Sequence, residues 1–186
     1  MTLYTRRTAA LTLFAGPMAL AACGNGIGGT GAADINARVA STLQFMFSNY
    51  PGTRDIAARA AGTLVMPLVT EVGLGLGGSY GRGALLIRET PVDYYSIASA
   101  SAGLQIGAQQ FSHVLFFMTE DSLLAFRTSP GWAVGADAEY VVSDQGETLR
   151  AESTTSLSPV IAVIFGQTGL RVGASLEGAK YTRIIP

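Results

Sequence analysis

The sequence predicts an α+β fold in which helices near the N-terminus are followed by a glycine-rich β-sheet. Apolar residues recur at helical spacing over residues 35–50. Residues 73–83 read Gly-Leu-Gly-Leu-Gly-Gly-Ser-Tyr-Gly-Arg-Gly, with glycine or serine at every odd position, so one face of a strand here is nearly bare backbone. Glycine weakens a strand interior, so we expect another backbone, a helix, a sharp bend or a ligand to approach this face closely.

The glycine pattern recurs along the chain. The form Gly-(Leu/Trp)-x-(Leu/Ile/Val)-Gly-(Gly/Ala) occurs at residues 73–78, 103–108, 131–136 and 169–174. The spacing between copies is too uneven for a solenoid. We interpret the copies as four strands of one sheet, each with larger apolar side chains on one face and small or polar residues on the other. This is the pattern of a sheet with one buried face.

Composition and charge narrow the class of protein. The 186 residues fit one domain. Because 48% of the residues are apolar and only 13% are charged, the composition excludes a disordered chain and a nucleic-acid binder with a basic face. The net charge of −1 becomes −3 without residues 1–22, which hold two arginines and no acid. This charge argues against simple electrostatic attraction to an anionic membrane, although a local basic patch stays open.

Residues 1–22 have the pattern of a targeting segment. The basic pair Arg6-Arg7 precedes an apolar run that is too short and too interrupted to span a membrane. The tetrad ending at Cys23, Leu-Ala-Ala-Cys, is similar to a bacterial lipobox and implies cleavage before Cys23 and lipidation of that residue. The alternative is an ordinary secretory signal with a chance cysteine. The arginine pair also resembles a twin-arginine export signal, so the export route stays open.

The lipobox also predicts where the protein resides. Cys23 is the single cysteine of the chain, so no internal disulfide can form. Residues 23–33 are expected to be a flexible tether and residues 34–186 a single domain. Glycine follows the cysteine where aspartate would signal retention, which by analogy with well-studied bacteria predicts an anchor in the outer membrane, facing the periplasm.

Two helices are predicted after the tether. Asp34 is a plausible N-cap of the first, and Pro51-Gly52 ends it. Its apolar stripe consists of Ile35, Val39, Leu43, Phe47 and Tyr50, broadened by Phe45 and Met46. Because Arg38 is the one basic residue of its polar face, packing on the sheet is favoured over lying on a membrane. Thr53 is expected to cap a second helix over residues 54–61.

The rest of the chain is predicted to be mostly strands. A turn is expected from Pro91 to Tyr95, a helix over residues 120–127 capped by Thr119, and a loop or edge hairpin over residues 143–156. The expected strands cover residues 63–70, 73–83, 84–88, 104–118, 132–142, 159–165 and 169–185.

Several of these segments together resemble the SYLF domain family, which includes lipid- and actin-binding modules of eukaryotic endocytic proteins and bacterial lipoproteins. The resemblance rests on Val-Gly-Leu-Gly-Leu-Gly-Gly-Ser-Tyr-Gly-Arg-Gly at 72–83, Ser-Ala-Gly-Leu-Gln-Ile-Gly-Ala-Gln at 101–109, Gly-Ala-Asp-Ala at 135–138 and Gly-Ala-Ser-Leu-Glu-Gly at 173–178. It spans most of residues 55–185. It implies N-terminal helices against an antiparallel, strongly curved sheet or partly closed barrel, and binding activity without catalysis.

The chain departs from the family pattern in two places. Family members often have Ser-Lys-Gly before the last glycine strand, where this chain has Gln-Thr-Gly at 167–169, and a tryptophan near the position of Tyr94 and Tyr95. Eukaryotic members also bind lipid through an N-terminal amphipathic helix. In this chain a lipid anchor precedes the corresponding helix.

The residues that could carry chemistry do not form a catalytic or cofactor-binding pattern. Gly73, Gly75 and Gly78, with Asp93, match a dinucleotide fingerprint, but strand and turn follow where the fingerprint requires a helix. His113, the single histidine, cannot pair with Ser112 because neighbours on a strand face opposite sides. Asp137 and Glu139 are candidates for a calcium site or an acid/base pair, although solvent-facing acids are the favoured interpretation. We therefore expect no enzyme, cofactor or metal.

Two binding functions stay open at this stage. The favoured one is a membrane-anchored envelope lipoprotein whose domain binds lipid, with anionic phospholipid as one candidate. The expected lipid-binding residues lie on or beside the glycine strands and are Gly73, Gly75, Gly77, Tyr80, Arg82, Arg88, Arg171 and Lys180, with Arg183 as a further basic candidate. For each basic residue taken singly, a solvated charge offset by neighbouring acids is the favoured interpretation. The alternative is a structural or adaptor protein that binds other proteins through a strand edge or an aromatic patch around Trp132, Tyr94 and Tyr95.

Overall fold

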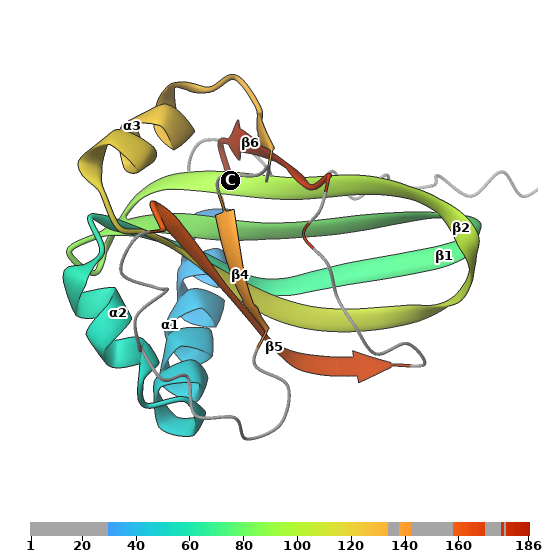
Figure 1. Ribbon diagram of the computed structural model, residues 1–186, viewed down its shortest axis with the longest axis horizontal. Coiled ribbons are helices and arrows are strands. Elements are labelled where there is room, and N and C mark those ends of the chain that lie inside the picture. Colours follow the sequence, from blue (N-terminus) through green and yellow to red (C-terminus); the bar gives the residue numbers. More distant parts are fainter. Residues whose placement is uncertain (1–29, 134–137, 143–157, 170–175, 177) are drawn as a thin grey trace, which may run out of the picture.

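The computed structural model describes residues 30–133, 138–142, 158–169, 176 and 178–186 and has the predicted α+β architecture (Figure 1). The helices in these ranges are α1 (Gly31–Asn49), α2 (Thr53–Arg59) and α3 (Glu120–Thr128). The strands are β1 (Gly62–Ile87), β2 (Thr90–Phe117), β3 (Trp132–Ala133), β4 (Ala138–Val142), β5 (Val160–Gly169) and β6 (Lys180–Ile184).

A long antiparallel hairpin of β1 and β2 forms the centre of the fold. The two strands pair from Gly62 and Phe117 at the open end to Ile87 and Thr90 at the turn. Figure 1 shows the hairpin curling back on itself halfway along, with β2 on the outside of the bend. At the bend a single residue of β1, Gly75, lies opposite residues 103–105 of β2. The outer strand thus has the longer path, and the strong curvature expected for the sheet is confirmed.

Glycines on the inner side of the hairpin allow its two halves to touch. A Cβ atom at Gly83 would overlap the carbonyl oxygen of Val65, and one at Gly81 would lie 2.7 Å from the carbonyl oxygen of Leu68. Both contacts join the second half of β1 to its own first half. Among the partners expected for the bare face, the one found at these two positions is therefore another stretch of backbone.

Each half of β2 also pairs with a later strand. Residues 94–98 pair with β6, which continues to β3, and residues 109–117 pair with β5, which continues to β4. These pairings are antiparallel, as expected, except that β4 and β5 run parallel. The first two copies of the glycine pattern face each other across the hairpin, with Gly73 opposite Gly107. Most of the other two copies lies outside the described residues.

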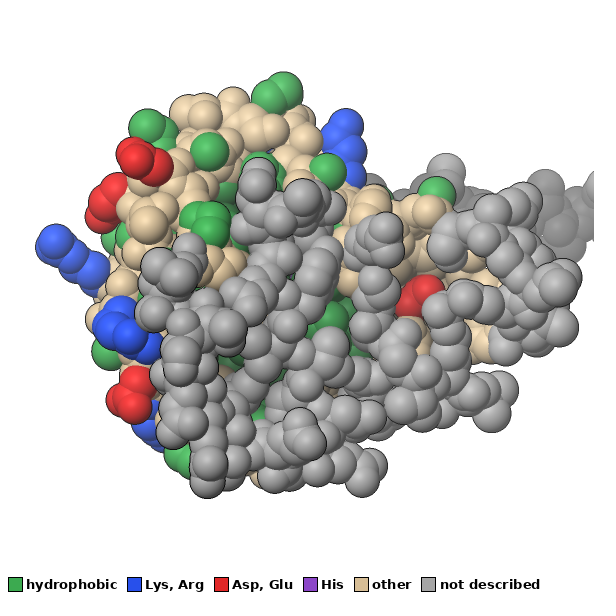
Figure 2. All heavy atoms as spheres, in the orientation of Figure 1, with side chains coloured by type: hydrophobic (Ala, Val, Ile, Leu, Met, Phe, Trp, Pro, Cys, Tyr) green, Lys and Arg blue, Asp and Glu red, His purple; other side chains and the backbone are tan. Residues whose placement is uncertain are grey.

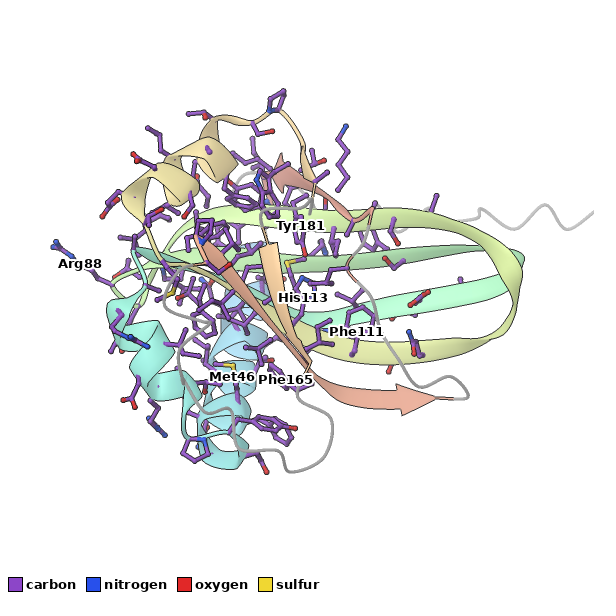
Figure 3. All side chains as sticks on the ribbon, viewed as in Figure 1. Met46, Arg88, Phe111, His113, Phe165 and Tyr181 are labelled. Atoms are coloured by element: carbon purple, nitrogen blue, oxygen red, sulfur yellow. The ribbon has the colours of Figure 1, made fainter. Side chains whose placement is uncertain are left out.

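The sheet is buried on both faces, not on one as the pattern predicted. The core on one face is covered by α3 and includes Leu64, Met66, Leu85, Tyr95, Phe111, Leu115, Phe117, Phe126, Ile164 and Tyr181. The core on the other face is covered by α1 and α2 and includes Ile35, Val39, Met46, Ile56, Val65, Ala84, Leu86, Val114, Phe116 and Phe165. Figure 3 shows Met46 and Phe165 on this second side. The packing of α1 on the sheet, favoured over a membrane-lying helix, is confirmed.

The helix boundaries correct two predicted caps. α1 begins at Gly31, with Thr30 at the N-cap position, so Asp34 lies in the first turn and is no cap. α2 begins at Thr53 itself, whose buried side chain donates a hydrogen bond to the Tyr50 carbonyl oxygen at 2.7 Å. The third cap is confirmed, because the Thr119 side chain accepts a hydrogen bond from the Ser122 amide.

The predicted turn was placed wrongly. Pro91 to Tyr95 lie in β2, and the reversal occurs at Arg88 and Glu89, whose φ angles of 50° and 66° form a two-residue turn. The predicted strands over residues 63–88 consequently merge into one strand. Of the predicted strand 132–142, residues 134–137 lie outside the described residues, as does the loop or hairpin 143–156. None of the described helices has the length and apolar character needed to cross a membrane.

Candidate functional site

A groove lies between α1, α2 and the turn that joins β1 to β2. Its volume is about 690 Å³. Val39, Leu43 and Phe47 of α1 contribute apolar lining, and Leu86 of β1 contributes more. The other lining residues are Asn36, Ala40, Arg54, Ala57, Ala58, Ala60, Gly62, Thr63, Arg88, Glu89 and Pro91. We call this feature the α1–α2 groove.

Two arginines from separate elements supply positive charge to the groove. Arg54 of α2 lies over the Phe47 ring, with its guanidinium carbon 4.9 Å from the ring centroid. Arg88 stands at the tip of the hairpin turn and points away from the sheet (Figure 3). Within the described part of the chain, neither arginine forms an ion pair. Glu89 is the single acidic residue of the lining, so the groove carries a net positive charge.

The sequence of the turn that presents Arg88 is unfavourable for the backbone conformation of that turn. Two-residue turns with positive φ at both positions favour Asn-Gly, because side chains with a full Cβ crowd the backbone there. Arg88 and Glu89 adopt φ values of 50° and 66°, at a cost of about 1 kcal/mol each. Residues held in such conformations concentrate at binding and catalytic sites. The turn therefore favours a role for Arg88 beyond the reversal of the chain.

The structure does not bring the predicted lipid-binding residues together. Arg88 alone of that set lines the α1–α2 groove, while Tyr80 and Arg82 are exposed on the other flank of α1. Lys180, on β6, lies across Gly131. Arg171 lies outside the described residues, and Gly73, Gly75 and Gly77 are at the hairpin bend. Figure 2 shows the basic side chains on the visible face spread out instead of forming one patch.

The aromatic patch expected for a protein-binding adaptor is not formed. Tyr95 is buried, with its ring 4.6 Å from that of Phe126, and the Trp132 ring lies 5.3 Å from the same ring. Tyr94 points to the opposite face, where its hydroxyl accepts a hydrogen bond from the Asn36 amide at 3.0 Å. Because adjacent residues on a strand face opposite sides, Tyr94 and Tyr95 cannot share one surface. The predicted patch is therefore wrong.

His113 has the structural role that was favoured for it. It is fully buried, and its Nε2 lies 2.7 Å from the Tyr181 hydroxyl (Figure 3). Desolvation by burial lowers the His113 pKa to about 3, so the ring is neutral near pH 7. Ser112 faces the other side of the strand and donates to the Pro67 carbonyl oxygen at 2.6 Å. The two residues form no nucleophile relay.

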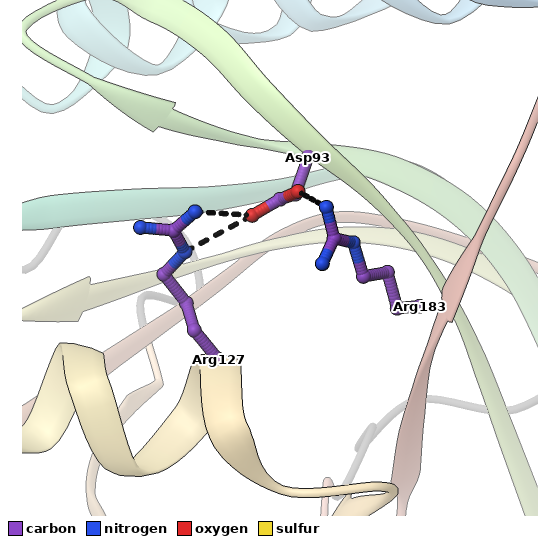
Figure 4. Close-up of polar contacts among 3 residues, drawn as sticks. All are labelled: Asp93, Arg127 and Arg183. Atoms are coloured by element: carbon purple, nitrogen blue, oxygen red, sulfur yellow. Dashed lines mark hydrogen bonds and ion pairs between the residues drawn. The ribbon is translucent and has the colours of Figure 1, made fainter.

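Asp93 and Arg183 also have structural roles. The buried Asp93 carboxylate forms ion pairs with Arg127 of α3 at 3.0 Å and with Arg183 of β6 (Figure 4). The glycines that match a dinucleotide fingerprint continue into strand, so the helix required for that fingerprint is missing there, as expected. Asp137 and the Glu139 side chain lie outside the described residues. Among the described residues, no three His, Cys, Asp or Glu side chains gather as a metal site would require.

Sequence reasoning missed most of the groove. The apolar stripe of α1 was assigned wholly to the core, whereas Leu43 and Phe47 are only partly buried and line the groove. One signal was available, because seven apolar positions are more than packing on one surface of the sheet requires. No signal indicated Arg54, because its approach to Phe47 depends on how α2 folds back against α1.

Part of the chain is similar to a known protein family. Residues 98–183 match the model of the Ysc84 family, described as Las17-binding protein actin regulator. No curated protein matches the chain. The matched region starts within β2, includes α3 and the strands β3 to β5, and ends within β6. It contains three of the four segments on which the resemblance rests, and the family is associated with lipid and actin binding. The match over residues 98–183 therefore supports the expected resemblance to the SYLF domain family.

Proposed function

We propose that this protein is a lipid-anchored protein of the bacterial envelope whose SYLF domain binds a lipid with an anionic head group in the α1–α2 groove. The observation that carries this proposal is a groove of about 690 Å³ that joins an apolar lining to two arginines without ion-pair partners in the described chain. Grooves of roughly 300–1,000 Å³ with mostly apolar linings and a few polar groups are typical ligand sites.

The groove suits both parts of a phospholipid. Burial of an acyl chain against Val39, Leu43 and Phe47 would contribute about 0.8 kcal/mol for each methylene removed from water. Arginine presents a planar set of donors that fits phosphate oxygens, and Arg54 and Arg88 supply two such groups. Their origin on α2 and on the hairpin turn would make phosphate binding depend on both elements.

The proposed anchor is the lipidated Cys23, followed by the short tether. It would hold the domain next to a bilayer, and we propose the outer membrane, with the domain facing the periplasm. In this arrangement the lipid would reach the groove from the membrane that carries the anchor. The family description names an actin regulator, but we prefer lipid as the ligand of this chain because the predicted aromatic patch is absent and the groove is present.

Native mass spectrometry of the full chain, purified in detergent and exchanged into phosphatidylglycerol or phosphatidylcholine, tests the proposal. We expect bound lipid of defined mass and a preference for phosphatidylglycerol. Ala58→Trp should fill the groove and abolish binding, whereas Ala125→Trp, at an exposed position on α3, should leave it unchanged. Arg88→Asn should reduce the preference for the anionic lipid. Absence of lipid in the parent chain, or equal binding by both tryptophan variants, would contradict the proposed site.

A further inference from the structure

The second flank of α1 borders an exposed apolar surface. Leu68, Val72 and Tyr80 of β1 are 39%, 54% and 58% exposed. They lie on the same face of the sheet as α1, beyond the part that the helix covers. Leu68 and Tyr80 also line a shallow hollow together with Asp34, Ile35 and Arg38 of α1, and Pro67, Thr70, Gly81 and Arg82 of β1.

Small residues continue this surface on β2. Ala98 lies opposite Tyr80 and Ala108 lies opposite Val72, and both alanines are exposed. Residues directly opposite each other in an antiparallel pair present their side chains on the same face. We call the surface formed by Leu68, Val72, Tyr80, Ala98 and Ala108 the β1 apolar surface. Its side chains expose apolar area where a monomeric protein usually places polar groups.

Two arginines border the β1 apolar surface. Arg38 projects from α1 and Arg82 from β1, and neither forms an ion pair among the described residues. Asp34 is the single acid in the lining of the hollow, so the local charge is positive although the net charge of the chain is −1. Apolar side chains bordered by arginines, with an aromatic ring among them, match the interface of an anionic bilayer.

The start of α1 places this surface close to the proposed anchor. Asp34 and Ile35, in the first turns of α1, line the hollow. Cys23 lies seven positions before Thr30, and that length of chain spans at most about 25 Å when fully extended. A bilayer that holds a lipid on Cys23 is therefore within reach of the β1 apolar surface, without any rearrangement of the domain.

We propose that the β1 apolar surface, with Arg38 and Arg82, docks the domain on the anionic bilayer that holds its anchor. The inference rests on the anchor of the proposed function and is independent of the α1–α2 groove. The tether alone would leave the domain free to turn. Contact of Leu68, Val72 and Tyr80 with the bilayer fixes one orientation, in which α1 lies beside the membrane.

The test uses the full lipidated chain in vesicles of phosphatidylcholine, with or without phosphatidylglycerol. Tyr80→Cys places an environment-sensitive fluorophore on the surface, and Leu124→Cys places it on α3, at a position 61% exposed. Lipidation blocks Cys23, so only the introduced thiol reacts. With phosphatidylglycerol present, we expect a blue shift and quenching by nitroxide-labelled lipids at position 80 and neither at position 124. Equal quenching at both positions would overturn the proposal.

Further variants separate this surface from the groove and from the anchor. Arg82→Gln should lower the docked-to-undocked ratio about fivefold, as expected for one arginine near an anionic surface. Arg88→Asn, in the groove, should leave docking unchanged. Flotation with vesicles measures separately whether the lipid on Cys23 attaches the chain to the bilayer. If the parent chain does not float, the Cys23→Ala chain, labelled at position 80, is titrated with phosphatidylglycerol vesicles. Absence of a blue shift at position 80 then overturns the proposal. This outcome would not bear on lipid binding in the groove.

Discussion

Gly83 lies against the carbonyl group of Val65, so closely that a methyl group on residue 83 would overlap the Val65 oxygen. The two residues belong to the same strand, β1, which returns past its own first half after the bend. This contact converts a long hairpin into a curled sheet with an interior.

Replacement of Gly83 by alanine tests this contact. The obstacle is backbone, which cannot move aside without disturbing the sheet, so we expect Gly83→Ala to lower the free energy of unfolding by about 3 kcal/mol. Gly131→Ala is the matched control, because its methyl group would meet only the end of the flexible Lys180 side chain. Urea unfolding measures both variants. Similar small losses would show that the two halves of β1 do not touch at Gly83.

The turn at Arg88 and Glu89 predicts a stabilising substitution. Glu89→Gly removes the Cβ atom from a residue with φ of 66° and should raise the free energy of unfolding by about 1 kcal/mol. Glu89→Ala removes the same charge but keeps the Cβ atom, so it should gain far less. Thermal unfolding of the two variants separates these effects. An equal gain for both would attribute the change to charge and not to backbone conformation.

Burial of His113 predicts that stability falls in acid. Its pKa is about 3 in the folded protein and near 6.5 in the unfolded chain, so above pH 6.5 both states are neutral and this contribution is fully present. As the pH falls from 6.5 toward 3, only the unfolded chain takes up a proton. The free energy of unfolding should then decrease by up to about 1.4 kcal/mol per pH unit.

Urea unfolding over this pH range measures the effect. His113→Gln should remove this component of the pH dependence, whereas Tyr181→Phe should keep it, since the imidazole stays buried. A His113→Gln variant with the same pH profile as the parent protein would contradict the assignment.

The ion pairs of Asp93 predict that removal of both arginines lowers the free energy of unfolding more than removal of the aspartate charge does. The Arg127 and Arg183 side chains are 40% and 66% exposed, so Asp93→Asn leaves both arginines solvated and should cost about 1 kcal/mol. Arg127→Ala combined with Arg183→Ala leaves a carboxylate only 2% exposed without a cation, and should cost about 3 kcal/mol. Thermal unfolding compares them, and a larger loss for Asp93→Asn would contradict this account.

Local sequence patterns predicted the elements of the fold better than their connections. The period of the α1 stripe and the cap at Thr119 depend on neighbouring residues, and both are found in the structure. The turn was missed because Arg88 and Glu89 are not turn-forming residues, while Pro91 is one and lies in a strand. The contact between Val65 and Gly83 joins positions brought together only by the bend, so the glycines indicated a close approach without identifying its partner.

The candidate site was less predictable than the fold. Arg88 was among the predicted residues, but Arg54 was not, because its place in the groove depends on the packing of α2. Arg183 was only a further candidate for a head-group site, and it pairs with Asp93, which a different strand supplies. An exposed arginine and a paired arginine look alike in a sequence when their partners are far apart along the chain.

The pairing of β2 with β1 limits how far the chain can be shortened before it fails to fold alone. The family match begins at residue 98, inside β2, so excision at that boundary would divide the strand and remove all of β1. The fragment would lack Leu64 and Leu85 from one core and Val65 from the other. Its remaining stretch of β2 would present an open edge along which copies could associate. Because α1 also supplies Ile35, Val39 and Met46 to the second core, we expect an autonomous unit to begin no later than α1.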